Sequence, residues 1–240
     1  MRNILFVLLF WSTLPLFSSN YSGSLDVKFK QISLKEGLSQ STVFNILQDS
    51  IGYLWIATDD GLNRYDGYKF TLFKNDKNDP QSLMDNTVLS LFLHKNHFLW
   101  LGTNRGLSCY DTYLNKFYNY PKTVGGEKMW VYKIAELIHD EFLLATNLGL
   151  YKFSQSKGYS KLPFPNNLQA SALMKLSSGE WLVGSFSGLY VYSPKFNTSK
   201  LIGLKGINVQ VLLSRVNRPQ SIWLGTEGHG VMSFDLRKKL

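Results

Sequence analysis

The chain has 240 residues, of which 44% are hydrophobic and 18% are charged, so it is long enough to bury a substantial core as one domain. This composition excludes a disordered or acidic tail. The formal net charge of +9 comes from 26 Lys and Arg residues that are scattered along the sequence. A nucleic-acid-binding protein gathers its basic residues in a patch or stripe, so we expect no nucleic-acid partner.

The N-terminus has the layout of a secretory signal peptide. A basic start at Arg2 is followed by an apolar run over residues 4–11 and a polar exit around Pro15. A membrane anchor is the alternative, but this run is too short to cross about 30 Å of hydrocarbon. We therefore expect a signal peptide over residues 1–22, cleavage between residues 18 and 24, and a periplasmic or secreted mature chain with no membrane span of its own.

One segment recurs five times along the rest of the chain. Aligned on a hydroxyl residue, its copies lie at Thr58, Thr103, Thr146, Ser185 and Thr226. The period of about 42 residues fits one four-stranded propeller blade. A glycine follows each hydroxyl residue, where a tight hairpin needs positive φ. The sequence therefore predicts an all-β fold, a β-propeller of four-stranded blades over residues 23–240, with repeats at about 41–80, 86–122, 129–163, 169–205 and 207–236.

The inner strands of a blade lie between two neighbouring blades, so they should be apolar on both faces. Trp55, Trp100 and Trp223 recur at one position of the repeat. We interpret them as core residues rather than as a ligand cage.

These residues resemble a known family. The spacing of Val43, Ile46 and Asp49, followed by Gly52 and residues 54–66, closely resembles the two-component regulator propeller repeat. The resemblance implies the periplasmic sensor region of a hybrid two-component sensor kinase, and it implies binding of glycan fragments without catalysis by this domain. The expected ligand is then an oligosaccharide.

The sequence contains no kinase, receiver or helix-turn-helix motif. We therefore expect either a truncated or split gene product or a freestanding propeller, and the partner would be the remainder of a sensor kinase or a second propeller. Only four repeats have a fourth, outer strand. A strand over residues 27–32 could complete the fifth blade and close a five-blade ring. A fragment of a seven-blade propeller is the other interpretation, and it is the one that we favour.

Candidate ligand-binding residues follow from topology. The loops that enter the first strand of each blade and join its second and third strands lie on one face of the disc. These loops carry polar and aromatic side chains suited to hydroxyl-rich or charged ligands. The candidates are Asp59, Asp60, Asn104, Arg105, Trp130, Glu227 and His229. For each residue alone, an ordinary solvated turn is the competing interpretation.

The sequence offers no pattern for catalysis, metal binding or a cofactor. His94, His97, His139 and His229 are scattered, and no metal-ligand spacing is present. The single cysteine, Cys109, excludes an internal disulfide. We expect no enzyme activity, no metal and no cofactor. A propeller-fold lyase or hydrolase and a protein–protein interaction scaffold remain alternatives, because a fold does not decide function.

Overall fold

The computed structural model describes residues 28–95, 97–218 and 220–238. The chain divides into two compact units, residues 1–31 and 32–240, and every strand belongs to the second. The expected signal peptide lies outside the described residues. Residues 28–32 form no strand, so the ring-closing strand expected over residues 27–32 is not seen in its described part. Apolar residues alternate with lysine in this segment, as they would in a strand with one buried face. A strand also needs a neighbouring strand to bond its backbone groups, and alternation alone does not provide one.

The first blade shows how the repeat folds. Its strands are β1 (Val43–Gln48), β2 (Leu54–Thr58), β3 (Gly61–Tyr65) and β4 (Phe70–Phe73), and each pairs antiparallel with the next. β-branched and aromatic residues dominate these segments, as a pleated and buried surface favours. The turns between them are rich in Asp and Gly residues.

Three further blades repeat this four-stranded meander, and the fifth has three strands. Blade 2 contains β5 (Val88–His94), β6 (Phe98–Thr103), β7 (Gly106–Asp111) and β8 (Lys116–Pro121). Blade 3 contains β11 (Val131–Ile138), β12 (Glu141–Thr146), β13 (Gly149–Ser154) and β14 (Gly158–Lys161). Blade 4 contains β15 (Ala170–Lys175), β16 (Trp181–Ser185), β17 (Gly188–Ser193) and β18 (Thr198–Gly203). Blade 5 contains β19 (Val209–Ser214), β20 (Ser221–Thr226) and β21 (Gly230–Asp235).

Short elements lie outside the blades. A hairpin of β9 (Thr123–Val124) and β10 (Glu127–Lys128) joins blades 2 and 3. Two 3₁₀ helices, η1 (Leu34–Glu36) and η2 (Leu236–Lys238), precede β1 and follow β21. The sequence did not predict these elements, which are too short to show a hydrophobic period.

The repeated hydroxyl residue closes the turn between the second and third strands. Thr58 Oγ1 donates to Gly61 O at 2.9 Å, and Ser185 Oγ donates to Gly188 O at 2.8 Å. Gly61 and Gly188 have φ of 110° and 137°, values that side chains with a Cβ rarely adopt. The prediction of a glycine-dependent hairpin at this position is confirmed.

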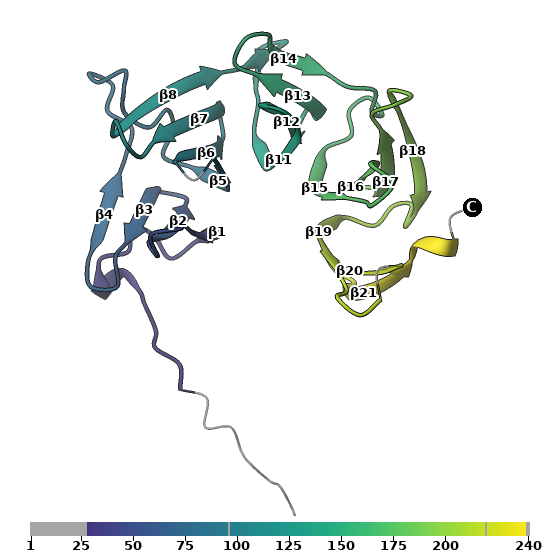
Figure 1. Cartoon of the computed structure of the whole chain (residues 1–240), viewed down its shortest axis with the longest axis horizontal. Helices are drawn as coiled ribbons and strands as arrows, with labels where there is room; N and C mark the ends of the chain where they lie inside the picture. The colour runs from purple at the N-terminus through teal and green to yellow at the C-terminus, as the bar shows by residue number, and fades with distance from the viewer. Residues whose placement is uncertain (1–27, 96, 219, 239–240) are drawn as a thin grey trace, which may run out of the picture. The chain divides into compact units, whose positions relative to one another are not determined.

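The five sheets follow one another along an arc within residues 32–240, with the first strand of each blade on the inside and the last on the outside (Figure 1). A separate apolar cluster fills each of the four spaces between successive blades. Between blades 1 and 2, Trp55 contacts Tyr110 with ring centroids 5.6 Å apart. The predicted all-β propeller with five blades is confirmed.

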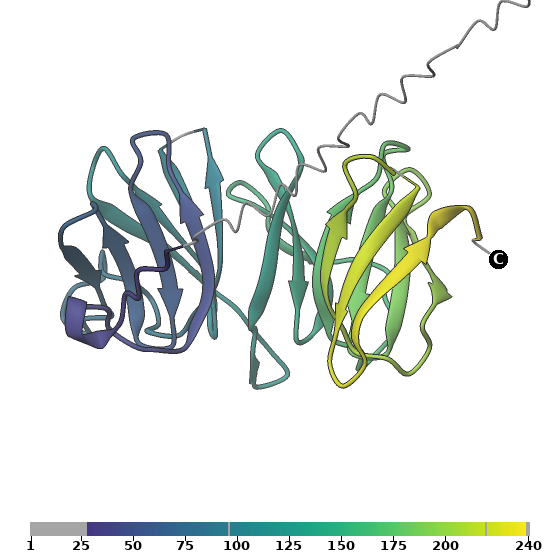
Figure 2. The same cartoon turned by 90° about the horizontal axis from the view of Figure 1, so that it is seen from below.

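Seen from the side, the strands run between two opposite ends at which the turns gather (Figure 2). We call one of them the loop end; it carries the turns between second and third strands, at residues 59–60, 104–105, 147–148, 186–187 and 227–229. We call the other the hairpin end; it carries the turns between first and second strands, whose described residues are 49–53, 95, 97, 139–140, 176–180, 215–218 and 220.

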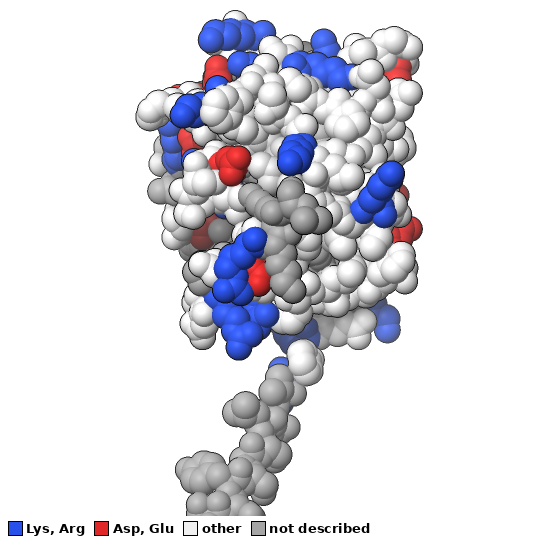
Figure 3. All heavy atoms as spheres, turned by 90° about the vertical axis from the view of Figure 1, so that its right-hand side faces the viewer, with Lys and Arg blue, Asp and Glu red and all other residues white. Residues whose placement is uncertain are grey.

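Charged side chains are dispersed over the face that carries β18 and β21. Figure 3 shows its Lys and Arg side chains separated by acidic and uncharged ones. In the part of the chain that the structure describes, no helix is both long enough and apolar enough to cross a membrane.

Candidate functional site

The predicted ligand-binding residues all lie at the loop end, but they do not form one cluster. The three carboxylates among them are bonded to other side chains of the propeller. Asp60 forms an ion pair with Lys74 at 2.6 Å, and Asp59 accepts a hydrogen bond from Thr87 at 3.0 Å. Glu227 accepts from Asn208 at 2.6 Å. These carboxylates therefore stabilise turns and blade contacts.

The remaining predicted residues differ in how well their polar groups are satisfied. Arg105 donates weakly to Met84 O at 3.4 Å, and His229 contacts Glu227 O at 3.3 Å. The side-chain oxygen of Asn104 is buried without a hydrogen-bond partner. Asp59 is the residue of blade 1 equivalent to Asn104, and it is bonded by the hydroxyl of Thr87, which precedes the first strand of blade 2. The residue equivalent to Thr87 before blade 3 is Trp130, which has no hydroxyl to offer Asn104.

An aromatic row lies at the loop end of blades 3 and 4. Trp130 is 43% exposed and meets Tyr132 edge to face at 6.5 Å, and Tyr132 stacks on Phe186 at 6.0 Å. The Tyr132 hydroxyl donates to the Gln169 side chain at 3.0 Å. Of these four residues the sequence predicted Trp130 alone, because the row is formed by different repeat positions in two blades.

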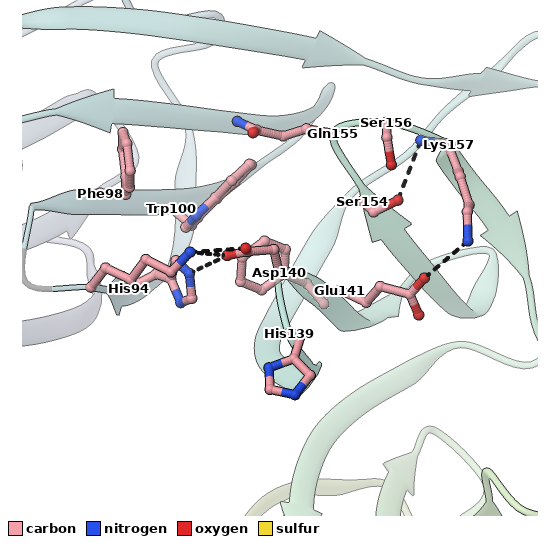
Figure 4. Close-up of a pocket in the computed structure, with 12 residues that line it drawn as sticks. His94, Phe98, Trp100, His139, Asp140, Glu141, Ser154, Gln155, Ser156 and Lys157 are labelled. Carbon is pink, nitrogen blue, oxygen red and sulfur yellow. Dashed lines mark hydrogen bonds and ion pairs between the residues drawn. The ribbon is translucent and has the colours of Figure 1, made fainter.

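A cavity with aromatic walls lies at the hairpin end, between blades 2 and 3. It encloses about 440 Å³, which is within the range for small-molecule sites. Figure 4 shows its walls, where Phe98 and Trp100 face residues of the β11–β12 and β13–β14 turns. The polar lining comes from both blades: His94, Lys95, His139, Asp140, Glu141, Ser154, Gln155, Ser156 and Lys157.

Three side chains in the lining of this cavity, His94, Lys95 and Asp140, join the two blades. His94 is buried, and its Nε2 lies 2.6 Å from Asp140 Oδ1. Lys95 Nζ bonds both oxygens of the same carboxylate at 2.7 and 2.8 Å. The hydrogen bonds from Lys95 and then from His94 lower the pKa of Asp140 below its usual value. Asp140 is thus held ionised as the bridge between blades.

Trp100 contributes a hydrogen-bond donor that the protein leaves unused. Its indole nitrogen is buried and has no hydrogen-bond partner, although the ring contacts Phe142 at 4.7 Å. In blade 1 the equivalent Trp55 donates to Asp49 Oδ2 at 2.8 Å. His94 stands at the position of Asp49 and bonds Asp140 instead. An unsatisfied buried donor costs about 1–3 kcal/mol, so an acceptor supplied by a ligand would bind favourably there.

Within residues 28–95, 97–218 and 220–238, no three His, Cys, Asp or Glu side chains are grouped so that they could hold a metal ion. Lys157 lies 3.7 Å from Glu141 at the rim of the cavity, a loose pair that leaves hydrogen-bond donors available. The arrangement is therefore rich in donors and suits a ligand with several oxygen atoms.

The sequence of the first blade matches a known repeat. Residues 37–60 match the family described as Two component regulator propeller. The resemblance predicted from the sequence is confirmed.

A segment of the chain also matches a signal-transduction protein. A 55-residue segment is 47% identical to a histidine kinase from Formosa agariphila, and it covers 23% of this chain and 4% of that protein. The chain therefore spans a small part of the relative that it matches.

Solved structures share the arrangement of blades. The extracellular domain of a putative hybrid two component system from B. thetaiotaomicron superimposes with a TM-score of 0.69 at 25% identity, over 85% of this chain and 27% of that one. A second such domain from the same organism gives a TM-score of 0.60 at 21% identity, over 87% of this chain and 36% of that one. A virginiamycin B lyase from Staphylococcus aureus gives 0.64 at 14% identity, over 83% and 68% of the two chains, which shows the fold alone.

The matched propeller repeat contains the complete Asp49–Trp55 hydrogen bond, and the next repeat does not. Asp49 also accepts hydrogen bonds from the backbone amides of Ile51, Gly52 and Tyr53 at 2.9–3.0 Å. The second repeat has His94 there and forms the cavity. The replacement of Asp49 by His94 is visible when repeats 1 and 2 are aligned, and it is the sequence signal that could have indicated the cavity.

Proposed function

We propose that this chain is an extracytoplasmic sensory propeller that binds a sugar-sized, oxygen-rich ligand, such as a glycan fragment, without turning it over. The cavity between blades 2 and 3 is the proposed site. The observation that carries the proposal is a cavity of sugar-like dimensions that is lined by aromatic side chains and by several polar ones, with Trp100, whose buried indole N–H lacks an acceptor, among its walls.

The walls and rim of the cavity support this class of ligand. Phe98 is partly exposed and offers an apolar face on which a sugar ring could lie, and the buried rings of Trp100 and Phe142 back the cavity behind it. Lys157 and Ser156 lie at the rim, where they can donate to hydroxyl or carboxylate oxygens. The acceptors Asp140 and Glu141 are already engaged by lysines. The site therefore favours acceptor-rich ligands over cations.

The comparisons support a sensory role. The similar domains from B. thetaiotaomicron are extracellular parts of putative two component systems, and the matched histidine kinase is much longer than this chain. We infer that ligand binding here is coupled to signalling through a kinase region or a partner chain. Export from the cytoplasm is part of the same proposal.

Isothermal titration with a panel of mono- and oligosaccharides, both neutral and uronate-containing, tests the site. Trp100→Phe keeps the aromatic face but removes the N–H, so we expect about a 5- to 10-fold loss of affinity for a ligand that satisfies it. Trp55→Phe is the matched control, because it removes the same group from blade 1, and its affinity should equal that of the wild type. If Trp100→Phe binds the ligand with the same affinity as Trp55→Phe and the wild type, the proposed site is wrong.

The loop end is the competing location. Trp130→Ala removes the exposed member of the aromatic row. If the cavity is the site, this variant binds as the wild type does. A loss of binding in Trp130→Ala with no change in Trp100→Phe would instead place the ligand at the loop end.

A propeller enzyme, a lyase or hydrolase, is the competing function. Its fold-level support is the similarity to virginiamycin B lyase. Incubation of the purified chain with each ligand that binds, followed by product analysis, separates the two functions. Products formed at a rate above that of heat-denatured protein would overturn the binding-only proposal.

A further inference from the structure

The repeat tryptophan fills the space between blades 1 and 2 and between blades 2 and 3. Trp55 and Trp100 are 1% and 2% exposed, and Trp55 packs on Tyr110 of blade 2 with ring centroids 5.6 Å apart. The prediction that these tryptophans are core residues is confirmed for both. It does not hold for Trp223 of blade 5, which is 38% exposed, because the structure describes no blade that packs against its ring.

Blade 3 has a smaller residue at this position, and a groove of about 520 Å³ lies at the hairpin end between blades 3 and 4. The equivalent of Trp55 is Leu143, and the equivalent of Tyr110 is Tyr192. Leu143 and Tyr192 belong to the core cluster between these two blades, and Tyr192 lines the groove. Replacement of an indole by a leucine side chain therefore leaves room there for a ligand.

Two lysines face this groove from opposite blades. Lys152 on β13 lies directly across from Leu143, which packs toward blade 4, so the two side chains share that face of the sheet. Lys175 on β15 lies directly across from Trp181, which packs toward blade 3. Both lysines line the groove. The groove thus has an ammonium group on each side.

Neither ammonium group has an acidic partner in the part of the chain that the structure describes. Lys175 Nζ lies 5.8 Å from the centre of the Trp181 ring, and Lys152 forms no hydrogen bond, ion pair or ring contact. The one carboxylate in the described lining, Glu141, lies 3.7 Å from Lys157 instead. Lys152 is half-buried, so an anion in the groove would replace the water that this charge has lost.

Blade 1 shows how a cation at the position of Lys152 is satisfied elsewhere. Its equivalent there is Arg64, which lies 4.9 Å from the centre of the Tyr53 ring and 5.7 Å from that of Trp55. The equivalents of those two aromatic residues in blade 3 are Glu141 and Leu143. The cation has therefore been kept in blade 3 while its aromatic partners have been lost.

The rest of the lining suits an acid group that is carried by a larger molecule. Trp181 and Tyr192 are 4% and 3% exposed and form the buried back of the groove. The Tyr192 hydroxyl donates to Asn197 Oδ1 at 3.3 Å, which leaves the amide nitrogen of Asn197 as a further donor. The volume is within the range for small-molecule sites and far exceeds that of a carboxylate or sulfate group alone.

We propose that the groove between blades 3 and 4 is a second binding site, which takes an acidic sugar unit through its carboxylate or sulfate group. Lys152 and Lys175 bind the acid group from two sides. The groove lies across blade 3 from the cavity of the proposed function, and Glu141 lines both. The choice of a sugar as the carrier of the anion rests on the proposed function, whereas the anion site itself does not.

Isothermal titration with sulfated lactose, digalacturonate and unmodified lactose tests the site. Both acidic sugars should bind more tightly than lactose, and their affinity should fall when NaCl is raised from about 50 to about 500 mM, because salt screens the lysines. Lys152→Met and Lys175→Met each remove one charge. Each should weaken the binding of the acidic sugars by about 10-fold or more and leave that of lactose unchanged.

Three further variants control for net charge, for the position of the charge and for space. Lys205→Met removes an exposed lysine at the loop end of blade 4, so it should bind as the wild type does. Lys152→Arg keeps the charge in the form that blade 1 uses and should retain binding. Leu143→Trp restores the indole of the repeat, so it should abolish binding although both lysines remain. Thermal denaturation checks that each variant folds, and the lysine variants decide if Leu143→Trp does not.

Trp100→Phe separates this site from the cavity between blades 2 and 3. If the acidic sugars lose affinity in Trp100→Phe and in neither lysine variant, they bind in that cavity, and the second site is wrong while the proposed function stands. If they lose affinity in the lysine variants alone, the second site stands whether or not any ligand occupies the cavity.

Two other results would overturn the proposal. Equal affinities of Lys152→Met, Lys175→Met and Lys205→Met for both acidic sugars would show that the groove lysines do not bind the acid. Inorganic sulfate that binds as tightly as sulfated lactose would show a site for simple anions, in which the sugar makes no contact.

Discussion

Asp49 organises a turn and a core residue at the same time. One carboxylate oxygen accepts three backbone amides of the turn, and the other accepts the buried indole N–H of Trp55. Hydrogen bonds to a charged group are stronger than neutral ones, and loss of the carboxylate leaves the indole unsatisfied. This residue therefore links the loop conformation to the packing between blades 1 and 2.

We expect Asp49→Ala to lower the free energy of unfolding by about 2–4 kcal/mol, because it removes all four acceptor contacts. Urea denaturation followed by tryptophan fluorescence measures the change. Asp79→Ala is the control, since the Asp79 carboxylate caps a single exposed amide at Gln81. A destabilisation by Asp49→Ala no greater than that of the control would show that the turn does not depend on the carboxylate.

Cys109 lies fully buried on β7, in the cluster between blades 2 and 3. Burial, and then the nearby Asp111 carboxylate, raise the pKa of its thiol to about 12. The thiolate is the reactive form, so the native thiol should not react with iodoacetamide even at about pH 9, near the usual thiol pKa.

In denaturant, the same cysteine should react fully, and mass spectrometry counts the modification. Because the pKa is raised in the folded state, the unfolded chain loses this proton first as the pH rises. Native stability should therefore fall above about pH 9. Rapid labelling of the native protein at neutral pH would contradict the burial of Cys109.

At the scale of the elements, the second strands control how closely blades approach. A Cβ added to Gly102 on β6 would lie 2.2 Å from Val131 O at the start of blade 3. The same repeat position in blade 5 is Gly225, where an added Cβ would lie 3.1 Å from the Cβ of Val211 in the same blade. The backbone of one blade thus contacts its neighbour directly at Gly102.

Gly102→Ala should destabilise the protein by about 1–3 kcal/mol, because overpacking forces the backbones of blades 2 and 3 apart. Thermal unfolding by calorimetry provides the measurement. Gly225→Ala makes the same chemical change where no further blade presses on the strand, so its effect should be distinctly smaller. Equal effects in the two variants would mean that the contact between blades does not limit this position.

Sequence reasoning located the strands better than it located the site. The fourth strands of blades 1 to 4 and the glycine turns were predictable, because they depend on local turn chemistry and on a repeated pattern. The cavity was not predicted. It depends on contacts such as His94 to Asp140, which lie 46 residues apart, and on the loss of an Asp in one repeat.

The predicted ligand-binding residues lie together at one end of the blades, as topology leads one to expect. Topology fixes that end, since strands alternate in direction. Their hydrogen-bond partners, such as Lys74 for Asp60, come from other loops and have no local signature. The segment over residues 27–32 shows the same limit, because its alternating pattern did not specify a partner strand.

For the molecule as a whole, blade 5 should be the least protected part of the arc. Its sheet has three strands, and β21 pairs on one side with β20. The third strands of blades 1 to 4 pair on both sides. Regions with fewer buried contacts and unpaired backbone groups open more readily.

Hydrogen exchange monitored by mass spectrometry should show faster exchange in β21 than in β7, β13 and β17. Protection of β21 equal to that of β17 in a sample shown to be monomeric would mean that another segment pairs with this edge.

The loss of one Asp–Trp bond bears on how such a protein can evolve. In an array of repeats, stability is close to a sum of contributions from the units and their contacts, so one copy can change while the others maintain the fold. Blade 1 retains the hydrogen bond between Asp49 and Trp55, and blade 2 has exchanged the acceptor for His94. Duplication thus provides spare copies of a structural contact, and a copy released from that task can acquire a new specificity.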